Sequence, residues 1–408
     1  MISFDEALKL VLKNTTPIGK QKIKLKDSGG YVLAEDIKAK FNIPLFDNSA
    51  VDGFGVKVSD IKDASAELPV ELDLIGTIRA GDSGKILITP GTTVKILTGA
   101  IIPDSVEAVV MKEFCLEASN KILIKKSAMK WGNIRREGEE FCKGKEVVCM
   151  GKQITPPVIG LLASLGYSSF YVYKKPKVSI IVTGSELVKP GKKRLPGKIY
   201  ESNSYSLIAC LKELGIENIS LFFAKDKKQI ITKQVQKAIS TSDVIITVGG
   251  VSVGDYDFVK EVLYELGIKT YFTTVAIKPA KPNYFGTCIK KNKKKIVFGL
   301  PGNPVSSLVS YHQLIKPALL KMMGQINKSS FHVKAQLESD LKKKTNRLEF
   351  VRAVAEQKNG SLIVEPTKGQ GSHMLGGIAE ANCLIHFPRD KDLIHKGQNV
   401  EIELISWN

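Results

Sequence analysis

The chain has 408 residues with a formal net charge of +19, and 43% of its residues are hydrophobic while 25% are charged. This composition is that of a globular protein and excludes a disordered or fibrous chain, and the length exceeds one ordinary hydrophobic core, so several domains are expected. The surplus lysines stand in short tufts such as residues 290–295, without interleaved aromatic residues or a nucleic-acid-binding motif, so no nucleic-acid partner is expected.

The N-terminus and the cysteines bear on the compartment in which the protein works. The opening stretch MISFDEALKLVLKN carries Asp5 and Glu6 and is typical of an amphipathic helix rather than a signal peptide. The six cysteines show no CxxC spacing, so the sequence indicates neither a zinc site nor a disulfide framework. No apolar run approaches the roughly 18 residues of a membrane span. We therefore expect a cytoplasmic protein without a membrane partner.

The predicted elements change in character along the chain. Residues 1–40 indicate a helix and short strands, and residues 41–133 form short alternating runs broken by Gly and Pro, which predict a small β-rich domain. Residues 134–173 include a helix that begins at a pair of prolines. Residues 174–325 alternate strands with helices, and residues 326–408 return to short strands that predict a β-barrel or a sandwich.

The alternating strands and helices of residues 174–325 predict a parallel sheet with helices on both faces. Its strands are expected at four apolar runs, residues 178–182, 219–223, 244–248 and 296–299. In such sheets, ligands bind beside the carboxyl ends of the strands. The residues that follow these strands are therefore expected to form one site.

The loops after these strands, together with the segment AIKPAKPNYFG, carry polar side chains and glycines. The expected site residues there are Thr183, Gly184, Ser185, Glu186, Asp226, Gly249, Gly250, Ser252, Gly254, Asp257, Lys278, Lys281, Pro301, Gly302, Asn303, Pro304 and Ser306. A glycine turn before a helix suits an anion, because backbone N–H groups converge there, whereas carboxylates repel an anion. Magnesium reconciles the two, since carboxylates bind the ion and phosphate oxygens complete its octahedron. The residues thus predict a Mg²⁺-assisted phosphoanhydride or phosphoryl site.

Each of these residues also has a simpler interpretation when it is taken alone. Glu186 or Asp226 at a strand end could be a helix cap or a solvated loop residue, and Asp257 could cap the helix that follows it. Lys281 could lie on the surface, and the turn at residues 301–304 could be a plain connector. Only their convergence at one edge of the sheet favours the functional interpretation.

Polar residues also gather outside the α/β segment. Asp52 stands in the stretch IPLFDNSAVDGFGV, and Thr98 follows a predicted strand. Near the C-terminus, Arg347 and Arg352 lie in RLEFVRA and Ser372 lies in GQGSHM. Any one of them could belong to a turn, so the residues alone leave their role open.

Eight segments, in their order along the chain, carry a family resemblance: FDNSAVDGFGV, ILTGA, NIRREGEEF, VTGSEL, GGVSVGDYDFVK, AIKPAKP, GLPGNPVSS and QGSHM. Together they resemble the MoeA/gephyrin E-domain family, the molybdopterin molybdenumtransferases, over nearly the whole chain. The departures from the usual residues of the family are small, namely Val51, Phe54, Gly55, Glu140 and Glu201. Glu140 keeps the charge of the usual aspartate on a longer side chain.

The resemblance implies a defined activity. The family takes adenylylated molybdopterin and molybdate, cleaves the adenylate with Mg²⁺, and releases AMP together with the finished molybdenum cofactor. It also implies pathway partners, a molybdopterin adenylyltransferase before this step and molybdoenzymes after it. Three alternatives stay open: insertion of tungstate, the adenylyltransferase activity itself, and a non-catalytic scaffold of the gephyrin type. The long additional segments on either side of the α/β part argue against the second, and the intact set of carboxylates and lysines argues against the third.

The resemblance further implies a four-domain, elongated homodimer. Residues 1–40 and 134–173 would form an elongated linker domain, and residues 41–133 a β-rich domain. Residues 174–325 would form a MogA-like α/β domain that binds molybdopterin, and residues 326–408 a C-terminal β-barrel domain. Each site would join the α/β domain to the β-rich domain of the other subunit.

Functional positions also follow from the resemblance. The implied catalytic residues are Asp52, Glu186, Asp226 and Asp257. The last three of them would be the ligands of Mg²⁺. The implied substrate-binding residues include, besides the glycine and proline turns, Thr98, Lys278, Lys281, Arg352 and Ser372.

Overall fold

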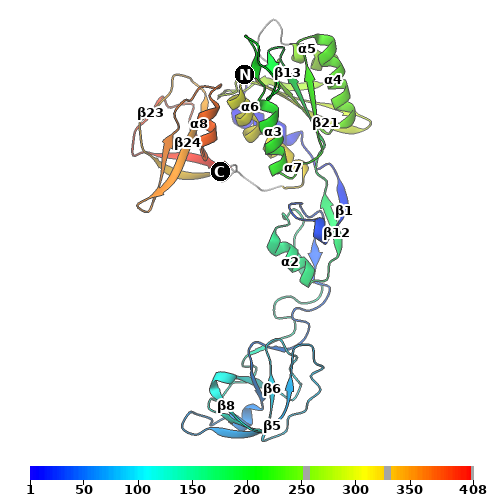
Figure 1. The fold of residues 1–408 in the computed structure, drawn as a ribbon, viewed down its shortest axis with the longest axis vertical. Helices are drawn as coiled ribbons and strands as arrows, with labels where there is room; N and C mark the ends of the chain where they lie inside the picture. The colour runs from blue at the N-terminus through cyan, green and yellow to red at the C-terminus, as the bar shows by residue number, and fades with distance from the viewer. Residues whose placement is uncertain (251–257, 326–331, 406–408) are drawn as a thin grey trace. The chain divides into compact units, whose positions relative to one another are not determined.

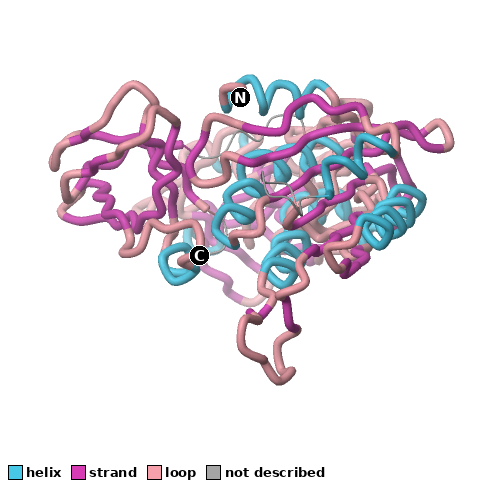
Figure 2. Tube along the Cα trace, turned by 90° about the horizontal axis from the view of Figure 1, so that it is seen from above, coloured by secondary structure: helices cyan, strands magenta, loops and turns pink. Residues whose placement is uncertain are grey.

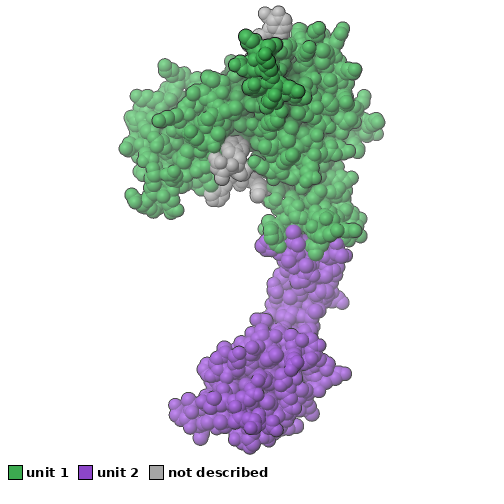
Figure 3. Space-filling model, viewed as in Figure 1, with its two compact units in different colours: residues 1–34, 151–156, 169–408 green, residues 35–150, 157–168 purple. Residues whose placement is uncertain are grey.

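The computed structural model describes residues 1–250, 258–325 and 332–405. The chain divides into two compact units (Figure 3). Unit 1 comprises residues 1–34, 151–156 and 169–408, and unit 2 comprises residues 35–150 and 157–168. The four finer domain boundaries expected from the sequence stay predictions. No helix in the described part of the chain combines the length and the apolar character that a membrane span requires.

Unit 1 is built around a six-stranded mixed sheet. Its strands, in spatial order, are β16 (Ile219–Ala224), β13 (Val178–Thr183), β17 (Val244–Val248), β21 (Lys293–Leu300), β20 (Pro282–Lys290) and β18 (Lys269–Thr274). The first four run parallel, as the sequence predicts, and β20 and β18 extend the sheet by antiparallel pairing. The antiparallel part arises because β20 and β21 form a hairpin at the lysine tuft, where Lys291 and Asn292 adopt positive φ angles of 50° and 57°.

Helices cover both faces of this sheet (Figure 1). The first face carries α1 (Phe4–Lys13), α3 (Asn203–Glu213), α6 (Pro304–Ser310), the π-helical turn η4 (Tyr311–Ile315) and α7 (Lys316–Met322). The second face carries α4 (Lys228–Thr241) and α5 (Phe258–Glu265). Ile180 of β13 packs in the first core, and the next residue, Ile181, packs in the second. Burial on both faces explains why this strand is a continuous apolar run.

The C-terminal part of unit 1 is a closed barrel, and this settles the choice between barrel and sandwich. Its five strands, in order around the barrel, are β24 (Leu348–Lys358), β25 (Ser361–Pro366), β22 (His332–Leu337), β28 (Asn399–Leu404) and β26 (Cys383–Phe387). The barrel closes because β26 pairs with β24 as well as with β28. Figure 2 shows its strands as a ring at the left of the view.

The barrel is joined to the α/β part of unit 1 by a short ladder. Strand β19 (Ile277–Lys278) pairs in parallel with the start of β24, with Ile277 opposite Leu348. Helix α8 (Leu375–Glu380) follows β25 and packs on β24. The ladder brings barrel residues close to the α/β sheet.

Several short elements complete unit 1. Two antiparallel strands, β1 (Lys20–Lys24) and β12 (Ser169–Tyr173), pair over five residues. The remaining elements are η1 (Leu25–Asp27) and the two-residue strands β14 (Leu187–Val188), β15 (Ile199–Tyr200), β23 (Leu341–Lys342) and β27 (Leu393–Ile394).

Unit 2 is β-rich, as the alternating runs of the sequence predict. Its six-stranded sheet has the order β7 (Ala108–Met111), β4 (Gly53–Val56), β6 (Thr92–Ile96), β5 (Val70–Ile78), β9 (Lys121–Ile124) and β8 (Cys115–Ala118). Smaller elements are β2 (Ile37–Lys38), β3 (Asn48–Ser49), η2 (Val58–Ile61), η3 (Lys112–Phe114), β10 (Ile134–Arg135) and β11 (Glu146–Val148). Helix α2 (Pro156–Ser164), most of which belongs to this unit, begins at the predicted pair of prolines.

Two glycines of unit 1 offer a matched test of packing at a helix end. Gly324 and Gly267 have φ angles of 81° and 73°, and each closes its helix with the same pair of backbone hydrogen bonds. A Cβ at Gly324 would lie 2.0 Å from Cδ2 of Tyr173, whereas a Cβ at Gly267 would meet no atom within 4 Å. We expect Gly267→Ala to cost about 1–2 kcal/mol for its left-handed backbone. Gly324→Ala should cost about 1–3 kcal/mol more, because the new methyl group overpacks the site.

Urea unfolding of the two variants measures this difference. A clearly lower midpoint for Gly324→Ala than for Gly267→Ala is the expected result. Equal midpoints would contradict close packing between the end of α7 and Tyr173.

Candidate functional site

The carboxyl ends of the parallel strands in unit 1 surround a cavity of about 670 Å³. Twelve of the residues predicted from the sequence line it, namely Thr183, Gly184, Glu186, Asp226, Gly249, Gly250, Lys278, Pro301, Gly302, Asn303, Ser306 and Ser372. These residues come from all the predicted strand ends and from a loop that follows β25. The structure therefore brings together segments that lie far apart in the sequence.

The other predicted residues lie elsewhere. Ser185, Lys281, Pro304 and Arg352 belong to unit 1 but do not line the cavity, while Asp52 and Thr98 belong to unit 2. The rest of the predicted set, Ser252, Gly254 and Asp257, lies outside the described residues.

Glycine is required where two strand ends meet at the cavity. The N–H of Gly249, directly after β17, donates a hydrogen bond of 3.0 Å to the carbonyl oxygen of Leu300. Gly249 has a φ angle of 85°, and a Cβ there would lie 2.7 Å from the carbonyl oxygen of Thr183. Any side chain at this position would push the ends of β13 and β17 apart.

The acidic part of the cavity consists of Asp226 and Glu186. The N–H of Ser185 donates to Oδ2 of Asp226 at 2.7 Å, and the N–H of Asp226 donates to Oγ of Ser185 at 3.3 Å. The carboxylate of Glu186 lies over Gly184, where a Cβ would be 2.9 Å from its oxygens. Within the described residues, neither carboxylate forms an ion pair. Two carboxylates without a cationic partner are the hard oxygen ligands that Mg²⁺ prefers, so this part of the cavity fits that ion.

The turn at Pro301–Pro304 is held from two sides. Nδ2 of Asn203 at the start of α3 donates to the carbonyl oxygen of Gly302 at 2.8 Å. Nδ2 of Asn303 donates to Oγ of Ser372 at 3.0 Å, and the N–H of Val305 donates to the carbonyl oxygen of Ser372 at 3.1 Å. The turn thus positions Asn303 and Ser372 together at the cavity.

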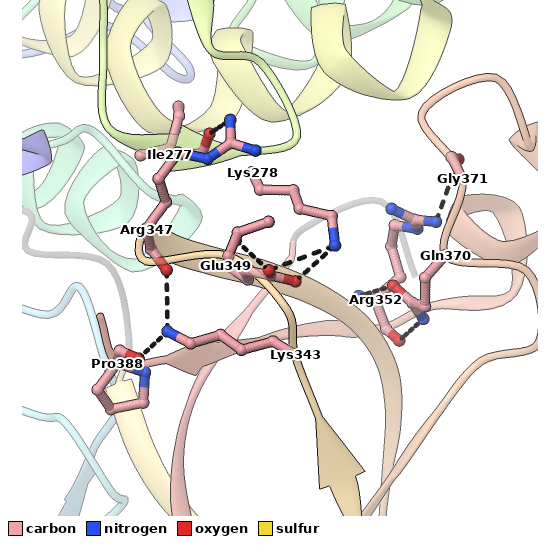
Figure 4. A network of polar contacts seen from close by, with 10 residues as sticks. Ile277, Lys278, Lys343, Arg347, Glu349, Arg352, Gln370, Gly371 and Pro388 are labelled. Carbon is pink, nitrogen blue, oxygen red and sulfur yellow. Dashed lines mark hydrogen bonds and ion pairs between the residues drawn. The ribbon is translucent and has the colours of Figure 1, made fainter. Parts of the chain in front are cut away.

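The cationic part of the cavity consists of Lys278 and Arg347 (Figure 4). Nζ of Lys278 lies 3.0 Å from Oε2 of Glu349, and the side chain of Lys278 is 43% exposed whereas that of Glu349 is 9% exposed. Nη1 of Arg347 donates to the carbonyl oxygen of Ile277 at 3.0 Å. Because both contacts orient a flexible side chain, positive charge is held at one side of the cavity.

Arg352 supports the cavity without lining it (Figure 4). It is 1% exposed, and its Nη2 donates to the carbonyl oxygens of Gly369 and Gly371 at 2.7 and 3.3 Å. Burial lowers the pKa of its guanidinium group to about 10. Its backbone N–H and C=O bind the side-chain amide of Gln370, which does line the cavity. Arg352 therefore positions the loop at residues 369–372.

Asp52 and Thr98, which the sequence predicts as functional, contact each other in unit 2. Oδ1 of Asp52 accepts hydrogen bonds from the N–H and from Oγ1 of Thr98, at 2.8 and 2.7 Å. These two bonds lower the pKa of Asp52, and Nζ of Lys112 lies 3.6 Å from its Oδ2. Asp52 is therefore an ionised carboxylate with a fixed orientation.

Three cavity residues with polar side chains were not predicted as site residues from the sequence: Asn203, Arg347 and Gln370. Arg347 and Gln370 stand beside the predicted residues Arg352 and Ser372 in the two polar segments near the C-terminus. The polar density of these segments was the available signal, but it does not say which side chain reaches the cavity. Asn203 follows no predicted strand and gave no signal.

Comparison with known proteins accounts for the whole chain. A family model described as MoeA N-terminal region (domain I and II) matches residues 2–166, one described as probable molybdopterin binding domain matches residues 179–321, and one described as MoeA C-terminal region (domain IV) matches residues 334–405. A relative from Haemophilus influenzae, named molybdopterin molybdenumtransferase, is 36% identical over 409 aligned positions, which cover 99% of this chain and 98% of the relative. This chain belongs to the MoeA family.

Further relatives agree with this assignment. A protein of the same name from Staphylococcus epidermidis is 34% identical to this MoeA family member, with 100% of this chain and 96% of the relative covered. A solved structure of a molybdopterin biosynthesis MoeA protein from Pyrococcus horikoshii is 32% identical and superposes with a TM-score of 0.84, covering 99% of this chain and 100% of that protein. The fold predicted from the sequence, with a MogA-like α/β part and a C-terminal barrel, is confirmed.

The role assigned to Arg352 can be tested by hydrogen exchange. Arg352→Met removes both guanidinium hydrogen bonds to the loop at residues 369–372, and bonds from a charged donor contribute roughly 1.5–3 kcal/mol each. The amides of this loop should therefore exchange roughly tenfold faster or more. Arg389→Met is the control, because Arg389 is exposed and its Nε donates to Asn346 elsewhere on the barrel.

Mass-spectrometric exchange on both variants reads the loop directly. Faster exchange in Arg352→Met but not in Arg389→Met is expected. Unchanged exchange in Arg352→Met would show that other contacts hold the loop.

Proposed function

We propose that this chain is a molybdopterin molybdenumtransferase, which inserts molybdate into adenylylated molybdopterin in a Mg²⁺-dependent reaction that releases AMP. The observation that carries the proposal is the cavity at the strand ends, which is lined by the carboxylates Glu186 and Asp226 as well as by the cationic side chains of Lys278 and Arg347. The names of the relatives support the same activity. An adenylyl transfer to molybdopterin would precede this step, and molybdenum enzymes would receive its product.

Glu186 and Asp226 are the residues that would hold Mg²⁺. Both line the cavity, and neither forms an ion pair within the described residues. When bound, the ion would polarise the phosphoanhydride oxygens and stabilise the charge that develops on them. Asp257, the third expected ligand, lies outside the described residues.

The cationic and hydroxyl groups of the cavity would bind the anionic substrates. Lys278 and Arg347 can bind phosphate or molybdate oxygens through charge-assisted hydrogen bonds, with Arg347 in bidentate geometry. The hydroxyl of Ser372 and the amide of Asn303 add neutral donors beside them. No protein nucleophile is needed, because a water oxygen can attack a phosphorus of the phosphoanhydride. The P–O–P bond then breaks, AMP leaves and the other phosphate stays on molybdopterin, whose two dithiolene sulfurs take up molybdate with loss of one of its oxygens as water.

The carboxylates can be tested with isosteric variants. Glu186→Gln and Asp226→Asn keep the size of each side chain but remove a charged ligand, so each should raise the Mg²⁺ concentration for half-maximal activity by about tenfold or more. Glu365→Gln is the control, because Glu365 is exposed on β25 of the barrel. The assay follows AMP released from adenylylated molybdopterin and molybdate as Mg²⁺ is varied.

The same assay can overturn the proposal. Absence of AMP release above the protein-free control would show that the chain lacks the proposed activity. Unchanged Mg²⁺ dependence in both carboxylate variants would show that Glu186 and Asp226 do not bind Mg²⁺. AMP transfer from ATP to molybdopterin without molybdate would instead assign the adenylyltransferase reaction.

We also propose a homodimer in which Asp52 of one copy and Asp226 of the other serve the same reaction, as the family resemblance implies. Homodimers with twofold symmetry contain two equivalent sites. Asp52→Ala and Asp226→Ala homodimers should both be inactive. In a heterodimer of the two variants one site carries both lesions and the other carries none, so about half of the wild-type activity should return.

Differently tagged variants, co-expressed and purified through both tags, provide this heterodimer. Activity near half of wild type is the expected result. Activity near zero would mean that both residues act within one subunit.

A further inference from the structure

A second group of ligand atoms lies on the outer face of the barrel, away from the cavity. Among the described residues, His332, His386 and Glu403 each place one potential metal ligand within 4.8 Å of the others. They belong to β22, β26 and β28, which are neighbours or near neighbours around the barrel. We propose that these three residues bind one divalent transition-metal ion of the Zn²⁺ class.

The distances suit a common ion. Nε2 of His386 lies 3.2 Å from Oε2 of Glu403. Two ligands of a tetrahedral Zn²⁺ ion, each at about 2.0–2.1 Å from the metal, lie about 3.3 Å apart, so this pair already has the separation of two such ligands. The side chain of His332 is 34% exposed, and its ring centroid lies 4.9 Å from that of His386, so a small shift of this ring brings its ligand atom, already within 4.8 Å of the other two, to the ion.

Neighbouring side chains already orient these ligands. Nδ1 of His332 lies 2.6 Å from Oε1 of Glu401, which leaves the other ring nitrogen for a metal. A carboxylate behind a metal-binding histidine fixes its ring and raises its basicity. Nε2 of Gln313 donates to Oε2 of Glu403 at 2.5 Å, so the carboxylate ligand is also held in place.

Glu403 is a buried carboxylate for which a cation would be favourable. It is 2% exposed, and its carboxylate oxygens lie 3.4 Å from Nδ1 of His312 and 3.2 Å from Nε2 of His386. No lysine or arginine of the described chain lies within ion-pair distance of it. A divalent ion bound at Oε2 would replace the hydrogen bond between His386 and Glu403 and place a positive charge next to the buried carboxylate.

The donor set selects the class of metal. Two imidazoles and one carboxylate suit Zn²⁺ and its neighbours in the first transition row, whereas Mg²⁺ takes oxygen ligands. The group therefore differs in kind from the pair Glu186 and Asp226. The sequence shows no metal-binding spacing here, because the ligands are separated by 54 and 17 positions and meet only through the pairing of β28 with both β22 and β26.

A bound ion would tie three barrel strands together at the face that packs on the α/β part. Gln313, which contacts Glu403, belongs to η4 of that part. Metal binding should therefore stabilise unit 1.

Calorimetric titration of the full chain with ZnCl₂ tests the proposal. Saturating MgCl₂ is present to occupy oxygen-only sites, and a Cys142→Ser/Cys149→Ser background removes the two exposed thiols, which could bind Zn²⁺ on their own. The variants are His332→Gln and His386→Gln. The matched control is His395→Gln, since His395 is an exposed barrel histidine next to Asp340 and outside the group.

The expected result is one equivalent of Zn²⁺ at pH 7.5, with affinity reduced at least tenfold by His332→Gln and by His386→Gln and unchanged by His395→Gln. Zn²⁺ should raise the thermal midpoint of the parent protein but not that of His332→Gln. His332 is exposed, so its variant keeps the fold. Absence of binding by the parent protein, or binding that survives His332→Gln, overturns the proposal.

Discussion

The parallel pairing of β16, β13, β17 and β21 is the constraint on which the proposed active site depends. In the observed register, Thr183 lies opposite Ala224, Val182 opposite Val248, and Val248 opposite Leu300, so the four strands end at the same level. Four loops from distant parts of the sequence are thereby placed around one cavity. The ends of β13 and β17 approach so closely that only glycine fits at position 249.

The acidic and the cationic residues of the cavity come from different secondary-structure elements. Its carboxylates follow β13 and β16 of the α/β sheet, whereas Lys278 and Arg347 lie at the ladder between β19 and the barrel strand β24. The C-terminal part of unit 1 therefore contributes to the wall of the cavity. Glu349 and the buried Arg352 set the positions of the cationic side and of the loop at residues 369–372. A ligand that combines an anion with a divalent cation matches this arrangement.

The strand-end residues of this site could be predicted from the sequence, whereas Arg347 and Gln370, which also line the cavity, could not. Apolar runs followed by Thr183, Asp226 or Gly249 identify strand ends, and parallel strands put their ends at one edge. The same reasoning does not show that Arg347 and Gln370 line the cavity. Their positions depend on the pairing of β19 with the barrel strand β24, which is a long-range contact that local sequence patterns do not encode. The sequence analysis also did not place the antiparallel strands β20 and β18 at the edge of the parallel sheet.

The central claim is that one cavity at the strand ends holds both a divalent cation and the oxyanion substrate. Crystals soaked with Mn²⁺ in place of Mg²⁺ and with molybdate test it, since both elements can be located by anomalous scattering. The account predicts a manganese peak about 2.1 Å from carboxylate oxygens of Glu186 and Asp226, and a molybdenum peak in the same cavity beside Lys278 and Arg347. A manganese peak elsewhere in the molecule with none at these two carboxylates, or molybdenum outside the cavity, would contradict it.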